Sequence, residues 1–260
     1  MPRVDLTQRL AGRVAVVTGG ASGIGLAAAR RMHAEGATIV IADIEPASGK
    51  DAAGELSGLF VPVDVSDEVA VNALFDTAAT TYGSVDIAFN NAGISPAEDD
   101  VIERTELPAW QQVQDINLKS VYLCCRAALR HMVPARKGSI INTASFVAVM
   151  GSATSQISYT ASKGGVLAMS RELGVQFARQ GIRVNALCPG PVNTPLLQEL
   201  FAKDPDRAAR RLVHVPLGRF AEPEEIAAAV AFLASDDASF ITASTFLVDG
   251  GISSAYVTPM

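Results

Sequence analysis

The chain has 260 residues, of which 49% are hydrophobic and 18% charged, and its formal net charge is −6 at pH 7. This length suits one α/β domain with a large hydrophobic core. The negative net charge gives no electrostatic attraction to nucleic acid or to an anionic membrane, so we expect neither as a partner.

The sequence gives no signal for export or for membrane insertion. Residues 1–10 carry Arg3, Asp5 and Arg9 and no apolar stretch of the secretory kind. The longest uncharged run, 138–162, is rich in Ser, Thr and Gly rather than Leu and Ile, unlike a membrane-spanning helix. We therefore expect a cytoplasmic protein.

Cysteine and histidine are too few and too scattered to predict a disulfide framework or a metal site. The residues concerned are Cys124, Cys125, Cys188, His33, His131 and His214. We expect the cysteines to be core thiols in a reducing compartment, and we assign no metal.

The first motif is a strand, a glycine-rich turn and a helix. Residues 13–17 form an apolar run typical of a buried strand, the turn follows at 18–25, and helical periodicity covers 26–35. Glycines permit a tight turn, and the free N–H groups at the start of a helix attract a pyrophosphate. A second strand, 38–42, ends at Asp43, where a carboxylate suits the adenosine ribose hydroxyls of NAD. A plain turn between strand and helix is the alternative.

The alternation of strands and helices continues to the end of the chain. Further strands are predicted at 59–63, 85–89, 139–143, 182–187 and 245–248, and helices at 46–56, 68–82, 107–132, 159–179 and 223–233. Seven apolar strands alternating with helices predict a single-domain α/β Rossmann fold over 1–260. Its seven-stranded parallel sheet is doubly wound, with helices on both faces.

A segment at about 191–217 departs from this alternation. Pro195, Pro205 and Pro216 interrupt it, and its arginines are Arg207, Arg210 and Arg211. Because ligands of open α/β sheets lie beyond the carboxyl ends of the strands, we predict a substrate-covering helical segment at 194–213. For the arginines individually we favour solvated surface positions.

The predicted chemistry lies at Tyr159 and Lys163. On a helix, residues four apart share a face, so the ammonium would lie one turn from the phenol. A nearby cation favours the phenolate and would move the tyrosine pKa from about 10 toward neutrality, which suits a general acid or base. The alternative is an amphipathic tyrosine beside a surface lysine.

The motifs together resemble the short-chain dehydrogenase/reductase family over about 6–251. The matching residues are Thr18-Gly19-x-x-x-Gly23-Ile24-Gly25, Asp64-Val65, Asn90-Asn91-Ala92-Gly93, Asn117, Ser145, Tyr159-x-x-x-Lys163 and Pro189-Gly190. Within the family the chain is most similar to bacterial members labelled 3-oxoacyl-acyl-carrier-protein reductase. The loop between Ser145 and Tyr159 is one residue longer than is common in the family.

The resemblance implies roles for four catalytic residues. Tyr159 would be the general acid/base, Lys163 would lower its pKa and bind the nicotinamide ribose, and Ser145 would hydrogen-bond the substrate oxygen. Asn117 would hold a water through which Lys163 exchanges protons with solvent.

The resemblance also implies the cofactor site. Asp43 is added to this site because of its place after the second strand. The expected cofactor-binding residues are Gly19, Ser22, Gly23, Ile24, Gly25, Asp43, Asp64, Val65, Asn91, Ala92, Gly93, Tyr159, Lys163, Pro189, Gly190, Val192 and Thr194. Asp43 and Glu45, with no Lys or Arg in 20–22 or at 44–45, favour NAD(H) over NADP(H).

We therefore predict an NAD(H)-dependent oxidoreductase that interconverts a secondary alcohol and a ketone. Ile94, Phe146, Val147, Met150 and Gln156 suggest a partly apolar substrate pocket. Family members are commonly tetramers or dimers, and we expect a homotetramer or dimer in which the tail, 252–260, contacts a neighbouring subunit. The alternatives are a fatty-acid-type 3-oxoacyl-acyl-carrier-protein reductase and a catalytically silent nucleotide sensor.

Overall fold

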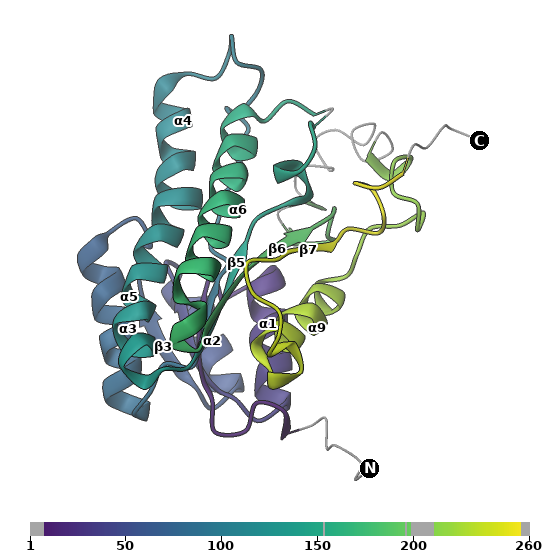
Figure 1. Cartoon of the computed structure of the whole chain (residues 1–260). Helices are drawn as coiled ribbons and strands as arrows, with labels where there is room; N and C mark the ends of the chain where they lie inside the picture. Colours follow the sequence, from purple (N-terminus) through teal and green to yellow (C-terminus); the bar gives the residue numbers. More distant parts are fainter. Residues whose placement is uncertain (1–7, 153, 196, 199–210, 256–260) are drawn as a thin grey trace, which may run out of the picture.

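One parallel sheet runs through the middle of the molecule (Figure 1). The computed structural model describes residues 8–152, 154–195, 197–198 and 211–255, and within them seven strands form this sheet in the order β3-β2-β1-β4-β5-β6-β7. The strands are β1 (Val14–Thr18), β2 (Thr38–Asp43), β3 (Leu59–Pro62), β4 (Ile87–Asn90), β5 (Gly138–Thr143), β6 (Ile182–Pro189) and β7 (Thr245–Val248). The order reverses beside β1, which confirms the predicted doubly wound α/β fold.

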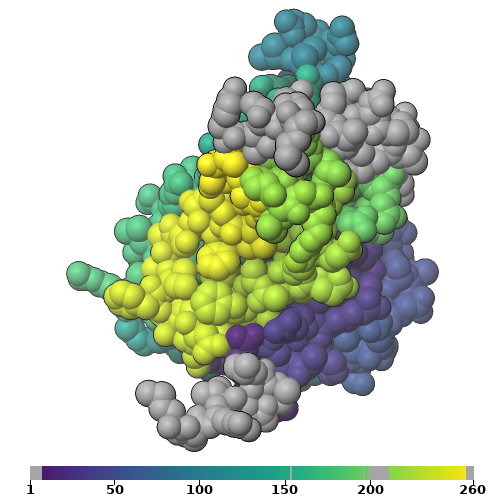
Figure 2. Space-filling view, turned by 90° about the vertical axis from the view of Figure 1, so that its right-hand side faces the viewer, coloured from purple at the N-terminus to yellow at the C-terminus, as the bar shows by residue number. Residues whose placement is uncertain are grey.

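Helices cover both faces of the sheet (Figure 1). One face carries α3 (Glu68–Tyr82), α5 (Ser120–Ala135) and α6 (Ile157–Phe177), and the other carries α1 (Gly23–Ala34), α2 (Pro46–Glu55) and α9 (Pro223–Ala234). In Figure 2, α9, coloured yellow-green, lies beside the purple N-terminal part of the chain.

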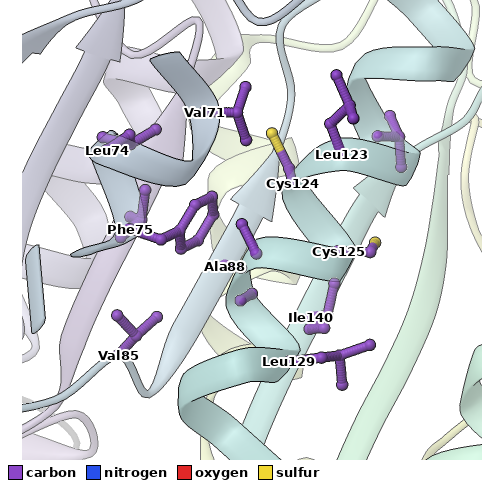
Figure 3. Packing of buried hydrophobic residues seen from close by; sticks show 14 of the residues in the cluster. Val71, Leu74, Phe75, Val85, Ala88, Leu123, Cys124, Cys125, Leu129 and Ile140 are labelled. Carbon is purple, nitrogen blue, oxygen red and sulfur yellow. The ribbon is translucent and has the colours of Figure 1, made fainter. Parts of the chain in front are cut away.

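The core is divided between these two faces because successive side chains of a strand point to opposite sides. In β1, Val14 and Val16 pack with α3 and α5, whereas Ala15 and Val17 pack with α1 and α9. Figure 3 shows the first cluster, where side chains of α3 and α5 meet over β4 and β5. A strand buried on both faces, such as β1, is mostly apolar along its length, which is why such strands are recognisable in the sequence.

The helix predicted at 107–132 is interrupted in the structure. It consists of α4 (Leu107–Gln114), a π-helical segment (Asp115–Lys119) and α5, which continues to Ala135. The π-helical segment contains Asn117, whose side-chain amide accepts a hydrogen bond from the Ile94 N–H and donates one to the Ile94 carbonyl oxygen. Such segments widen a helix locally, often at functional sites, and they leave no signal in the hydrophobic periodicity.

The predicted covering segment is only partly described, because 196 and 199–210 lie outside the described residues. Other predicted bounds differ from the observed ones by a few residues at most, as at β4, which begins at Ile87 and includes Asn90. Among the described residues, no helix has the length and hydropathy needed to span a membrane.

Candidate active site

The predicted site residues gather at one edge of the sheet. Gly19 follows β1, Asp43 ends β2, Asn91 follows β4, Ser145 follows β5 and Gly190 follows β6. Parallel strands all end on the same side, so the fold brings together residues that are far apart in the sequence.

A cavity of about 530 Å³ lies at this edge. Its lining includes thirteen of the predicted cofactor residues: Gly19, Ser22, Gly23, Ile24, Asp43, Asp64, Val65, Asn91, Ala92, Gly93, Tyr159, Lys163 and Thr194. Pro189, Gly190 and Val192 line a second, adjacent pocket instead. Gly25 lines neither and packs against the turn itself.

The glycine-rich turn is shaped to accept a dinucleotide. Gly19 has a positive φ of 62°, and a Cβ on Gly25 would lie 2.0 Å from the carbonyl oxygen of Gly19, so no side chain fits there. The N-cap residue of α1, Ser22, makes no side-chain capping bond to the helix. The first N–H groups of α1 therefore lack a side-chain cap beside the cavity, an arrangement that fits a pyrophosphate.

Two carboxylates lie along the rim of this cavity. Asp43 accepts hydrogen bonds from the backbone N–H of Ala21 (3.0 Å) and of Glu45 (3.2 Å), which ties the end of β2 to the glycine-rich turn. Asp64 accepts from the N–H and the hydroxyl of Ser66 (2.9 and 2.7 Å). Both carboxylates keep further lone pairs for a ligand, since each oxygen can accept more than one bond.

The loops after β1 and β4 are joined by direct hydrogen bonds. The Thr18 hydroxyl accepts from the backbone N–H of Asn91 (3.0 Å) and of Ala92 (3.2 Å). The Asn91 amide donates to the carbonyl oxygens of Thr18 and Gly19, both at 3.3 Å. These bonds fix the central wall of the cavity.

Tyr159 borders both the larger cavity and the smaller pocket, and Ser145 lines the smaller pocket. Of the residues predicted to form the substrate pocket, Phe146 and Gln156 line the smaller pocket, while Ile94 lines the larger cavity. Val147 is buried in the core and Met150 lies on the surface, so these two predictions were wrong. The longer loop before α6 explains the error, because positions within it cannot be assigned by spacing.

Lys163 is almost completely buried, with 3% of its surface exposed. Its Nζ donates to the carbonyl oxygen of Thr143 (2.7 Å) and lies 5.6 Å from the centroid of the Tyr159 ring. Burial lowers the Lys163 pKa to about 8. Removal from water disfavours the ammonium, and the carbonyl offers only partial compensation.

The tyrosine pKa differs from the sequence-based expectation. Burial raises the pKa of Tyr159, while a hydrogen bond with Ser145 and the charge of Arg211 act in the opposite direction. The predicted lowering by Lys163 is not found, because desolvation of the phenol is the larger effect and Lys163 is itself desolvated.

The buried Lys163 predicts a specific dependence of stability on pH. Its folded-state pKa of about 8 lies below the unfolded value of 10.5, so between these values the unfolded chain binds more protons and stability rises with pH. Lys163→Met should flatten this rise in urea unfolding. It should also raise the free energy of unfolding at neutral pH by about 2 kcal/mol, because one pKa unit corresponds to ~1.4 kcal/mol and loss of the Thr143 bond offsets part of the gain.

The matched control for that measurement is Lys50→Met, which removes an exposed lysine of α2. It should leave the pH dependence as in the unmodified protein. If the stability of Lys163→Met rises with pH over the same range and as steeply as that of the unmodified protein, the charge of Lys163 does not cause the rise.

Asn117 is fully buried beside Lys163. Its Oδ1 accepts from the N–H of Ile94 and its Nδ2 donates to the Ile94 carbonyl oxygen, both at 2.8 Å. A Cβ on Gly93 would lie 3.3 Å from Asn117 Oδ1 and 3.6 Å from Lys163 Nζ, so glycine lets this loop approach both. The side chain of Asn117 thus holds the loop after β4 next to the lysine.

Sequence reasoning missed two charged residues of the smaller pocket. Arg211, expected to be solvated, lines the pocket, donates to the Thr154 hydroxyl (3.4 Å) and opposes the rise of the Tyr159 pKa. Asp99 also lines the pocket and is buried. Neither belongs to a periodic pattern or to a family motif, so the sequence offered no signal for them.

A family model described as Enoyl-(Acyl carrier protein) reductase matches residues 19–253. Three curated relatives span nearly the whole chain. Cis-4-hydroxycyclohexanecarboxylate dehydrogenase of Sinomonas cyclohexanicum is 44% identical, covering 94% of this chain and 98% of its own. 3beta-Hydroxysteroid dehydrogenase 1 of Eggerthella lenta is 40% identical (94% and 94%), and the 3-oxoacyl-[acyl-carrier-protein] reductase FabG of Thermotoga maritima is 36% identical (94% and 99%).

The fold is also that of a solved reductase. The crystal structure of levodione reductase superposes with a TM-score of 0.90 at 36% identity, covering 95% of this chain and 100% of the other. A family model over most of the chain, relatives of this similarity and a matching fold leave no other assignment: the chain belongs to the short-chain dehydrogenase/reductase family and is an oxidoreductase of the kind that uses a nicotinamide cofactor.

Proposed function

We propose that the protein is an NAD(H)-dependent oxidoreductase that interconverts a secondary alcohol and a ketone, with Tyr159 as the general acid/base. The observation that carries this proposal is the position of Tyr159, which borders both the cofactor cavity and the smaller pocket. A proton donor in that place can reach a substrate whose carbon faces the cofactor. The nicotinamide ring supplies the hydride chemistry when bound.

The residues of this chain would handle the proton and the substrate oxygen. Ser145 lines the pocket and hydrogen-bonds with Tyr159, so its hydroxyl can bind the oxygen on which charge develops. In alcohol oxidation Tyr159 would take the hydroxyl proton, and in ketone reduction it would return it. Lys163 would bind the nicotinamide ribose and favour the phenolate when charged. Asn117 would keep the loop after β4 against Lys163.

The choice of NAD(H) is supported by the charge at the end of β2. Asp43 lines the cavity beside the glycine-rich turn, which contains no Lys or Arg between Gly20 and Ser22. A phosphate on the ribose would meet this carboxylate, and residues 20–22 and 44–45 supply no Lys or Arg to offset it. The Asp43 carboxylate disfavours NADP(H), and use of NADPH is what would favour a fatty-acid-type reductase. That reductase is therefore only the second candidate, although FabG is among the relatives.

The substrate pocket is partly apolar, with Arg211 and Asp99 as charged residues on its wall. Pro96, Ala97, Phe146 and Leu197 supply apolar surface, and Arg211 supplies a cation. By their names, two of the relatives act on cyclic alcohols, and one of these alcohols is a hydroxy acid. We propose a secondary alcohol on an apolar carbon skeleton as the substrate class.

A screen of alcohols and ketones followed by NADH absorbance tests the proposed function. It should include cyclic hydroxy acids, steroids and acyl thioesters. Turnover of ring alcohols supports the proposal, and turnover of acyl thioesters alone favours the fatty-acid-type reductase. If NADH binds but no alcohol or ketone is converted, the protein is a sensor instead.

We also propose a cytoplasmic homotetramer or dimer. Buried free thiols at Cys124, Cys125 and Cys188 suit a reducing compartment. An apolar groove between α5 and α6 includes Leu129 and Met169, and Tyr122 at its edge is 50% exposed. Contact with a second copy would cover this surface. The tail, also predicted to touch a neighbour, lies outside the described residues at 256–260.

Light scattering at micromolar concentration should give the mass of a tetramer or dimer. Tyr122→Glu should lower this mass by placing a charge in the groove, whereas Val69→Glu, on the exposed face of α3, should not. A monomeric unmodified protein would overturn the proposed assembly.

A further inference from the structure

The helix that carries Tyr159 is not capped by its own N-cap residue. α6 begins at Ile157, and the N-cap residue Gln156 makes no side-chain bond to the helix. The first N–H groups of any helix have no partner within it and need acceptors from elsewhere. In α6 these groups lie at the edge of the substrate pocket, directly before and at the tyrosine.

The loop after β4, which lines the same pocket, supplies the acceptors. The Asp99 carboxylate accepts from the N–H of Ser158 (2.8 Å) through Oδ1 and from the N–H of Tyr159 (2.7 Å) through Oδ2. The neighbouring Asp100 carbonyl oxygen accepts from the N–H of Ile157 (3.2 Å). Three successive N–H groups of α6 are therefore bound by two adjacent residues of this loop.

The Asp99 carboxylate is only 5% exposed. Burying a carboxylate is costly unless strong hydrogen bonds compensate it, and bonds from two helix N–H groups at the positive end of the helix dipole do so. The short distances are those of charge-assisted bonds. A side chain held in this way fixes the backbone to which it is bonded.

The other side of the same turn is held by α4. Ser158 is fully buried, its hydroxyl donates to the Trp110 carbonyl oxygen (3.0 Å), and the Gln114 amide donates to its carbonyl oxygen (3.0 Å). The first turn of α6 thus lies between α4 and Asp99. Removing the Asp99 carboxylate would leave the bond between the Ile157 N–H and the Asp100 carbonyl oxygen as the only one of the three described bonds from the loop to this turn.

Asp99 also connects the helix to the wall of the substrate pocket. Ser95, Pro96 and Ala97 line the same pocket as Tyr159 and Ser145, and the Asp99 N–H donates to the Pro96 carbonyl oxygen (3.2 Å). One side chain therefore sets the distance between the pocket wall and the tyrosine.

We propose that Asp99 is a positioning residue, which holds the first turn of α6 so that the Tyr159 phenol stays aligned with the substrate oxygen. The proposal rests on the proposed role of Tyr159. It differs from a purely structural role because it assigns to Asp99 an effect on the rate of the chemical step, beyond any effect on stability.

The test is the single-turnover rate of alcohol oxidation with saturating NAD, at a temperature where each variant is folded by circular dichroism. Asp99→Ala should slow this step about tenfold, less than the ~10²-fold that a misplacement of about 1 Å can cost. Asp99→Asn, which keeps one acceptor oxygen, should lose less and carries the test if the alanine variant does not fold. The dissociation constant of NADH should stay within about twofold, since Asp99 does not line the cofactor cavity.

The matched control is Glu98→Gln, which removes the same charge from the exposed neighbouring residue. Its rate should equal that of the unmodified protein. If Asp99→Ala and Asp99→Asn lower the melting temperature but leave the single-turnover rate unchanged, Asp99 is structural only and the proposal fails.

Amide hydrogen exchange over 157–163 tests, without a substrate, whether Asp99 holds the first turn of α6. Exchange should become faster in Asp99→Ala and not in Glu98→Gln. Unchanged exchange overturns the positioning role even if the protein is an alcohol dehydrogenase. A failure of the proposed function would show differently, as no turnover by the unmodified protein or as full turnover by Tyr159→Phe.

Discussion

Tyr159→Phe is expected to lower turnover by ~10²–10⁴-fold, the usual contribution of a general acid or base. The substitution removes only the phenolic oxygen, which the proposed mechanism needs for proton transfer. The aromatic ring, its packing and its contact with Lys163 remain. NADH binding should therefore change little, and the loss should fall on kcat rather than on KM. Steady-state kinetics and a fluorescence titration with NADH measure the two effects.

The matched control for this substitution is Tyr82→Phe at the end of α3, away from the site. It also removes one phenolic oxygen from the protein and should leave kcat unchanged. Near-normal turnover by Tyr159→Phe would remove Tyr159 from the mechanism, and with it the proposed reaction.

A preference for NAD(H) over NADP(H) of at least ~10²-fold in kcat/KM is the second large effect that we expect. The Asp43 carboxylate lies at the cavity rim, fixed there by the N–H groups of Ala21 and Glu45. It can accept hydrogen bonds from both adenosine ribose hydroxyls. A 2′-phosphate in the same place would meet like charge, which costs several kcal/mol, and ~1.4 kcal/mol is already tenfold in affinity.

Asp43→Ala should narrow this preference, chiefly by weakening NAD binding. Steady-state kinetics with both cofactors on one accepted substrate give the ratio for each variant. Asp51→Ala, which removes an exposed carboxylate from α2, is the matched control and should keep the original ratio. Equal or better use of NADPH by the unmodified protein would show that Asp43 does not act on the ribose, and would favour the fatty-acid-type reductase.

The sheet could be predicted from the sequence because its strands are buried on both faces. A run such as Ile39 to Ala42 must then be apolar at each position, and burial of all four is what the structure has. The residues that line the larger cavity could be predicted because glycines, strand ends and helix starts form a local motif. Gly19 and Gly25 are needed for backbone geometry that few other residues allow.

Contacts between distant residues could not be predicted in this way. Asp99 reaches α6 across 60 positions of the chain, and its partners are backbone N–H groups, which are present at every non-proline residue. The π-helical segment around Asn117 is set by the bonds to Ile94, and hydrophobic periodicity does not record them. The pKa of Tyr159 depends on burial, a property of the assembled fold and not of the spacing to Lys163.

The two cavities differ in how well their walls tolerate substitution. The larger cavity is walled by glycines and strand ends, where an added atom meets backbone, as a Cβ on Gly19 would lie 3.0 Å from the Cα of Ala92. The smaller pocket takes Pro96, Ala97, Phe146 and Gln156 from loops outside the strands. Substitutions there reshape the pocket without shifting the sheet. Substitutions in the segments that follow β4 and β5 can therefore change the shape of the smaller pocket while the backbone around the larger cavity keeps its geometry.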